Sequence, residues 1–358
     1  MAIPGLRDRD AIVTRDGLIL RVFGYSHLPE AYICDVEYAP AKIFRSDNPK
    51  ALRDGGQGIF CKFYEDEGWK FVQSEFRQYM IFHEVLDNYV AGVNYRDIDE
   101  VRKPELRLRN LIERKPNDEL VAAMQRVLKA AMQHSGLSTE NFGVFGSLLH
   151  GFHHPRFSDI DLIIYGGKNA IRLCQTLQEL YELESSPLRN EFKASQSMEG
   201  RNWRFHNLST EEYVWHQRRK LIYALFKDQE SGRIIKAEFE PVKEWKEIAN
   251  EYDSEARILK RGWIKMLARV TEDSDAPFIP SIYGIEPLEV LEGAKEALEV
   301  RRIVSYIEEF RMQAHKDEVV YVEGNLEEVA TSKSSFYQVA LTYCPRYYEQ
   351  VLKCAKRA

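Results

Sequence analysis

The sequence predicts an α+β protein in which an α/β core lies between a β-rich N-terminal domain and a mixed α/β C-terminal domain. Two patterns indicate this arrangement. Runs of β-branched and aromatic residues separated by turn residues fill the first hundred positions, and from residue 117 strand and helix patterns alternate. The 358 residues, 44% of them hydrophobic, suffice for more than one core. We expect domains at residues 1–112, 113–248 and 249–358.

The charge balance and the cysteines limit the classes of function. With 56 acidic and 50 basic residues the formal net charge is −6, so the chain has no protein-wide basic field with which to hold nucleic acid. The five cysteines are scattered without a Cys-x-x-Cys spacing, as is typical of a reducing compartment. No stretch approaches the ~20 apolar residues of a membrane-spanning helix. We therefore expect a cytoplasmic protein with no membrane partner.

The N-terminal region reads as a small sheet. Residues 11–14 and 18–23 flank Asp16-Gly17, a pair that favours a tight hairpin turn. Residues 31–38 and 58–64 have the same β-branched and aromatic bias. Residues 101–116 then carry six basic and two acidic residues, which marks the first domain boundary. A solvated helix or linker face explains such a charge run, and a local nucleic-acid contact is the alternative.

The core begins with a helix. Asn117, Asp118 and Glu119 form the expected N-cap and acidic first turn, and apolar residues then recur at helical spacing up to Gly136. Further elements of the core are expected as a strand at 142–145, a strand at 160–165, a helix at 170–183, a helix at 211–227 and a strand at 233–240 that Pro241 ends. Beyond residue 249 we expect helical content over 288–310 and a β pair at 319–324 and 336–341.

One stretch of this core carries recognisable chemistry. A buried strand runs into Gly146-Ser147 at a helix start, where free backbone N–H groups can hold a phosphate and glycine allows close approach. Asp159 and Asp161 follow, and because strand side chains alternate, both carboxylates project from one face. Two neighbouring carboxylates repel one another unless a cation lies between them, and oxygen ligands suit Mg²⁺ or Mn²⁺. A phosphate turn beside such a pair indicates phosphoryl or nucleotidyl transfer.

This combination resembles the nucleotidyltransferase superfamily of DNA polymerase β, whose motif is an apolar residue, Gly, Gly or Ser, a spacer, and then Asp-apolar-Asp. The resemblance implies a third carboxylate on a neighbouring strand, which completes the metal site near the attacking hydroxyl. Glu238 and Glu240 are both candidates by strand alternation. Archaeal CCA-adding enzymes have an Asp three residues before a Pro at this point, which favours Glu238, three residues before Pro241.

Two further groups of residues are candidates for nucleotide binding. Arg218, Arg219 and Lys220 have the charge and geometry to clamp a triphosphate, and packing of their stems along apolar surface is the alternative. The segment between the phosphate turn and the Asp pair is expected to line the substrate cleft without chemistry of its own; it contains His150, His153, His154, Arg156 and Ser158.

The overall layout also resembles an uncharacterised archaeal group of predicted nucleotidyltransferases that begin with Arg-Asp-Arg-Asp, as at residues 7–10 here. The resemblance implies an enzyme that uses Mg²⁺ or Mn²⁺ to move a nucleoside monophosphate from a nucleoside triphosphate, ATP among them, to an acceptor hydroxyl with release of pyrophosphate. The acceptor is not assigned; RNA is one of several classes, and no oligomeric state is predicted. The alternative is a catalytically silent nucleotide-binding regulatory or RNA-binding protein.

Overall fold

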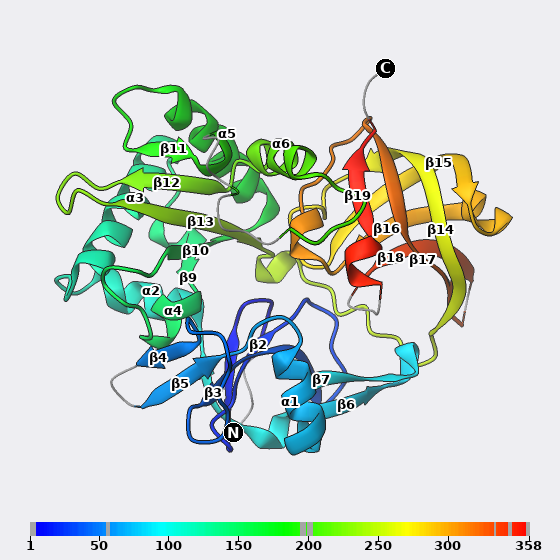
Figure 1. Ribbon diagram of the computed structural model, residues 1–358, viewed down its shortest axis with the longest axis horizontal. Coiled ribbons are helices and arrows are strands. Elements are labelled where there is room, and N and C mark those ends of the chain that lie inside the picture. Colours follow the sequence, from blue (N-terminus) through cyan, green and yellow to red (C-terminus); the bar gives the residue numbers. More distant parts are fainter. Residues whose placement is uncertain are drawn as a thin grey trace. The chain divides into compact units, whose positions relative to one another are not determined.

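The chain has three sheets and six α helices in the part that the computed structural model describes, residues 5–54, 58–193, 198, 203–332, 334–342 and 346–355 (Figure 1). This confirms the α+β class. The residues form two compact units. Unit 1 comprises Met1–His83, Asn88–Leu188 and Ala224–Tyr252, and unit 2 comprises Glu84–Asp87, Arg189–Tyr223 and Asp253–Ala358. The expected boundary after residue 112 falls inside unit 1. No helix in the described residues is both long and apolar enough to cross a membrane.

The N-terminal sheet of unit 1 has the strand order β4-β5-β3-β2-β1-β8, and β7 pairs with β3 and β6. Its strands are β1 (Ala11–Thr14), β2 (Ile19–Val22), β3 (Ala31–Pro40), β4 (Leu52–Asp54), β5 (Ile59–Lys62), β6 (Met80–His83), β7 (Asn88–Asn94) and β8 (Ile98–Arg102). The predicted hairpin is confirmed, since β1 and β2 pair antiparallel across a turn in which Gly17 has φ 82°. Helix α1 (Glu67–Glu75) packs on β3 through the fully buried Val72.

The second sheet of unit 1 has the order β11-β12-β13-β10-β9. Its strands are β9 (Phe142–Val144), β10 (Ile160–Tyr165), β11 (Leu188–Asn190), β12 (Tyr223–Lys227) and β13 (Ile234–Val242). The associated helices are α2 (Pro104–Ile112), α3 (Glu119–Ser135), α4 (Gly146–His150) and α5 (Gly167–Glu182). Helix α5 packs against α3 and against β10 and β13, so it covers the apolar face of the sheet.

The start of α3 differs by one residue from the prediction. Asp118, rather than Asn117, is the N-cap, and its side chain accepts hydrogen bonds from the backbone N–H groups of Leu120 and Val121. The helix ends at Gly136, which adopts the left-handed conformation with φ 65°. The predicted extent of this helix is confirmed.

The predicted helix over 211–227 is wrong in its second half. Helix α6 (Thr210–Lys220) ends at Leu221, which has φ 56°, and residues 223–227 form β12. Ala224 and Phe226 are buried while their neighbours are more exposed, so the segment alternates as a strand does. A short run of apolar residues fits either periodicity, and pairing with β13 decides for the strand.

Unit 2 contains a closed barrel. Strand β14 pairs with β15, β15 with β16, β16 with β18, β18 with β17, and β17 returns to β14. The strands are β14 (Arg257–Glu272), β15 (Ser281–Glu292), β16 (Val300–Ser305), β17 (Val319–Ala330), β18 (Ser335–Leu341) and β19 (Val351–Cys354), the last pairing with β17. Only β16 and β18 pair parallel within this ring. This order is that of the five-stranded Greek-key barrel known as the OB fold.

The barrel confirms one C-terminal expectation and corrects another. The predicted β pair corresponds to β17 and β18, which are antiparallel. The helical content expected over 288–310 is wrong, because these residues form the end of β15, β16 and two 3₁₀ turns. Ile303, Ala297 and Phe310 are fully buried in the barrel interior, and this packing determines the local structure.

Candidate active site

The two central strands of the second sheet bring carboxylates side by side. Strands β10 and β13 are parallel, and their register pairs Asp161 with Glu238. Paired residues on neighbouring strands share a face and lie about 4.8 Å apart at the backbone. Ile160 and Leu162 point to the opposite face, where both are fully buried. Asp159 directly precedes β10 and is exposed.

The phosphate turn lies directly against this pair. The Phe145 N–H donates to the Asp161 carbonyl at 3.1 Å, so the chain leaves β9 beside β10 and enters α4 at Gly146. Gly146 has φ 59°, and an added Cβ would overlap the Asp161 Oδ2 atom. Both observations require glycine. The Asp161 carboxylate therefore occupies the position that a side chain at residue 146 would take, and the turn packs directly against it.

The backbone donors at the start of α4 are available for an anion. The first bond within the helix runs from the Leu149 N–H to the Phe145 carbonyl, so the N–H groups of Gly146, Ser147 and Leu148 precede it. Helix α4 has only five residues, so any affinity for phosphate comes from these individual N–H groups rather than from a long helix dipole.

The electrostatics of Asp161 are unusual for a carboxylate. Burial is the main cause that raises its pKa to about 7, and the charges of Asp159 and Glu240 add to it. Lys62 and Arg9 act in the opposite direction. Without a cation, the site therefore holds much of Asp161 protonated near neutral pH. A divalent cation between Asp159 and Asp161 would restore the ionised form.

Glu240 is occupied by an ion pair. It is 3% exposed, and its Oε2 atom accepts from Arg9 Nη2 at 2.9 Å. The Arg9 guanidinium also lies 3.6 Å from Asp8 and over the Phe145 ring at 5.3 Å. Glu238 is partly exposed and stands next to Asp161 in register. These contacts favour Glu238 as the third carboxylate, which stays a prediction.

The N-terminal charged segment that holds Glu240 is a feature whose role the sequence did not reveal. Arg7, Asp8, Arg9 and Asp10 are all at most 4% exposed. Arg7 lies over the rings of Tyr165 and Trp245, Asp8 accepts from the Gly24 N–H, and Asp10 pairs with Lys103 at 2.6 Å. The signal in the sequence was the alternation of Arg and Asp directly before the first hairpin. In the structure all four side chains are buried, and opposite charges in the segment and around it compensate one another.

The residues predicted to clamp the triphosphate lie in unit 2. Lys220 is 1% exposed and donates to the Glu309 carbonyl at 2.7 Å. Arg218 donates twice to the Phe192 carbonyl, at 3.1 and 3.0 Å. Arg219 pairs with Glu318 at 2.5 Å and lies 4.2 Å over the Trp215 ring. The structure uses these three cations to hold α6 within unit 2 and does not bring them together with the carboxylates inside one unit.

The three histidines between the Gly146-Ser147 turn and Asp159 lie in different surroundings. His150 is buried between the rings of Tyr38 and Phe152, and burial lowers its pKa. His153 Nε2 lies 2.9 Å from an oxygen of Asp118, the N-cap of α3. His154 is exposed. Each therefore has separate surroundings.

The expected metal has no ready-made protein site. Among the described residues, no three His, Cys, Asp or Glu side chains are arranged to hold an ion by themselves. The donor set at Asp159, Asp161 and Glu238 is all oxygen, which fits Mg²⁺ or Mn²⁺, and Mg²⁺ commonly binds through one or two carboxylates plus substrate phosphates. The site thus fits a cation that arrives with a triphosphate.

The stability of the metal-free protein should depend on pH through Asp161. Its pKa is about 7 when folded and near 3.8 when unfolded, so the folded state binds more protons between these values. The free energy of unfolding therefore falls as pH rises from about 4 to 7. Asp161→Asn should remove this pH dependence. In urea unfolding with a chelator present, the free energy of unfolding of the variant minus that of the wild type should therefore increase from pH 5 to pH 7.5. A difference that does not change with pH would contradict the raised pKa of Asp161.

A similar protein matches this chain over most of its length. The chain is similar to Uncharacterized protein MJ1086 of Methanocaldococcus jannaschii, with 24% identity over 337 residues that cover 93% of this chain and 94% of that protein. No protein-family model and no solved structure matches the chain. The expected resemblance to uncharacterised archaeal proteins is confirmed, and the similarity extends through both units.

Proposed function

We propose that the protein is a metal-dependent nucleotidyltransferase. One observation carries the proposal: the register of β10 and β13 sets Asp161 beside Glu238, and the Asp161 carboxylate packs directly against Gly146 at the start of α4. A phosphate turn and oxygen donors on one face are the parts that triphosphate chemistry needs. The reaction would join the acceptor oxygen to the α-phosphorus and break the bond to the β-phosphate, so that pyrophosphate leaves.

Each residue has a role in this proposal. Asp159, Asp161 and Glu238 would hold the cation, which when bound supplies positive charge to the reacting phosphate. The N–H groups at Gly146 and Ser147 would bind phosphate oxygens. Glu238, beside Asp161, would face the acceptor hydroxyl, whose proton passes to solvent or a carboxylate as the oxygen attacks. Glu240 would take no part, because its carboxylate is already paired with Arg9 at 2.9 Å.

A silent nucleotide-binding protein is the second candidate. The described residues contain no preformed group of three metal ligands, and a Glu stands where the resembling enzymes more often have Asp. Such a protein would bind Mg²⁺–triphosphate at the same turn without turnover.

The fold of the barrel in unit 2 does not by itself assign it a function. Barrels of this type bind oligonucleotides or oligosaccharides through the face of their second and third strands. Here the second strand, β15, carries the exposed residues Glu286, Glu289 and Glu292. Two of them are ion-paired with β14, Glu286 with Arg269 at 3.7 Å and Glu292 with Lys265 at 2.8 Å, so charges of both signs lie along this strand pair.

Triphosphate binding should stabilise unit 1. Mg²⁺ with ATP at about 100 times its Kd should add about 2.7 kcal/mol of unfolding free energy and raise the melting temperature by several degrees. Mg²⁺ alone should do much less, because the triphosphate brings most of the ligands. The measurement is thermal unfolding followed by fluorescence, and equal protection by AMP and ATP would contradict a triphosphate cradle.

A further inference from the structure

The loop between the phosphate turn and Asp159 has a defined internal structure. His154 is its hub: its Nδ1 atom accepts from the Arg156 N–H at 3.1 Å, and its carbonyl accepts from the N–H groups of Phe157 and Ser158. The His154 N–H in turn donates to the Ser158 hydroxyl at 2.9 Å. Since Nδ1 accepts, the neutral ring carries its proton on Nε2.

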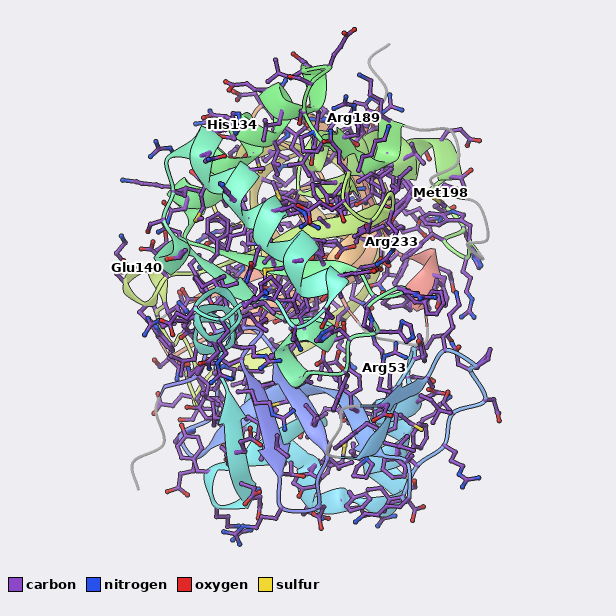
Figure 2. The ribbon with its side chains drawn as sticks, turned by 90° about the vertical axis from the view of Figure 1, so that its left-hand side faces the viewer. Arg53, His134, Glu140, Arg189, Met198 and Arg233 are labelled. Atoms are coloured by element: carbon purple, nitrogen blue, oxygen red, sulfur yellow. The ribbon has the colours of Figure 1, made fainter. Side chains whose placement is uncertain are left out.

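Two contacts fix this loop to the rest of unit 1. The guanidinium of Arg233, labelled in Figure 2, donates to the carbonyls of both Pro155 and Arg156. His153 is bonded to Asp118 at the start of α3, the helix that runs across the front of Figure 2. The loop is therefore held at residues 153, 155 and 156, directly before Phe157.

The fixed loop presents an aromatic surface. Phe157 is 79% exposed, more than any other large hydrophobic side chain in the described residues, and its ring lies 4.5 Å from that of His154 with 31° between the planes. An open depression of about 550 Å³ adjoins the rings and is lined by Asp118, Glu119, His154, Pro155, Arg156 and Phe157. A largely exposed phenylalanine beside an exposed arginine is typical of a surface that stacks nucleobases.

The distance to the candidate active site is short. Phe157 lies two positions before Asp159, so their Cα atoms can be at most about 7 Å apart. This separation is comparable to the distance between the base and the α-phosphate of one nucleotide. A base on the aromatic surface would therefore belong to a nucleotide whose phosphate lies at the carboxylates.

We propose that Phe157 and His154 form a nucleobase-binding platform for a nucleotide at the candidate active site. The inference rests on the proposed function and adds the part of the substrate that the carboxylates do not recognise. The exposed carboxylate of Glu119 lines the same depression and provides an acceptor for an exocyclic amino group. The base can come from the nucleoside triphosphate or from the end of an RNA acceptor, and the test distinguishes the two.

The test compares affinities by calorimetry with Mg²⁺ for ATP, inorganic tripolyphosphate and a six-residue oligoadenylate. Phe157→Ala should weaken binding of the base-containing probe about 5- to 150-fold, as stacking of about 1–3 kcal/mol gives, and leave tripolyphosphate unchanged. Phe157→Trp should retain the affinity. Loss for ATP alone assigns the platform to the triphosphate, and loss for the oligonucleotide alone assigns it to the acceptor.

Two controls keep the result specific. Tyr89→Ala removes another exposed aromatic residue, 56% exposed on the β6–β7 hairpin, and should change no affinity. Arg233→Ala frees the loop and should reproduce the loss seen in Phe157→Ala while leaving tripolyphosphate bound.

The opposite outcomes are distinguishable. Unchanged affinity of Phe157→Ala for both base-containing probes overturns the platform and leaves the proposed function standing. A wild type that binds none of the three probes overturns both proposals. A third outcome is that the wild type self-associates as its concentration rises, and that Phe157→Ala removes this association without changing nucleotide affinity. This outcome overturns the platform and shows that Phe157 contacts a second copy of the chain.

Discussion

Asp161→Asn is expected to lower the rate of nucleotide transfer about 1,000-fold or more, which corresponds to a loss of about 4 kcal/mol of transition-state stabilisation. The amide cannot bind the cation as a charged ligand, and it lies against the phosphate turn at Gly146. Asp159→Asn should have a comparable effect. The measurement is release of pyrophosphate from a nucleoside triphosphate with Mg²⁺ or Mn²⁺.

The control for this prediction is a carboxylate on the same unit. Asp99→Asn changes an exposed residue of β8 and should keep wild-type turnover. The melting temperature of Asp161→Asn without metal should equal or exceed that of the wild type, because one of two repelling carboxylates is gone. Near wild-type turnover in either Asp variant would show that the metal site is assigned to the wrong residues.

The two glutamates of β13 should separate catalysis from stability. Glu238→Gln should lower kcat at least about 100-fold and change the Kd for Mg²⁺–triphosphate only a few-fold, because the phosphate turn and the Asp pair remain. Glu240→Gln should instead cost about 3–5 kcal/mol of unfolding free energy, because it leaves the buried Arg9 guanidinium without its carboxylate at 2.9 Å. Single-turnover kinetics and denaturant unfolding measure the two effects.

Combining Glu240→Gln with Arg9→Gln tests the second half of this prediction. If the two groups act mainly on each other, the double variant should lose less stability than the sum of the single variants. A catalytic loss larger in Glu240→Gln than in Glu238→Gln, at equal folded fractions, would move the third ligand to Glu240. Unchanged turnover in both would show that neither glutamate is a ligand.

Local patterns predicted the parts of the site that lie within one strand or turn. Asp161 lies on β10 and Asp159 directly before it, and their common face, which strand alternation predicts, stays a prediction. The need for glycine at 146 follows from a strand that turns into a helix, and Gly146 has φ 59°. The pairing of Glu240 with Arg9 could not be predicted, because the two residues are 231 positions apart and only the tertiary fold joins them.

The errors in secondary structure have a similar cause. Residues 221–227 are apolar enough for a buried helix or a strand, and the left-handed Leu221 ends α6 for a tertiary reason, the pairing of β12 in the sheet. Residues 288–310 carry many glutamates, which favour helices, yet in the barrel they form the end of β15, β16 and two 3₁₀ turns. The barrel itself depends on the non-local pairing of β14 with β17.

The central claim is tested most directly by following two labels. The protein is incubated with Mg²⁺ or Mn²⁺, total RNA or cell lysate, and each of the four nucleoside triphosphates labelled at the α-phosphate or at the γ-phosphate. The account predicts that α-label enters one acceptor fraction, that γ-label is released as pyrophosphate, and that Asp161→Asn does neither. Transfer of γ-label to an acceptor, or tight triphosphate binding with no α-label in any fraction, would contradict nucleotidyl transfer.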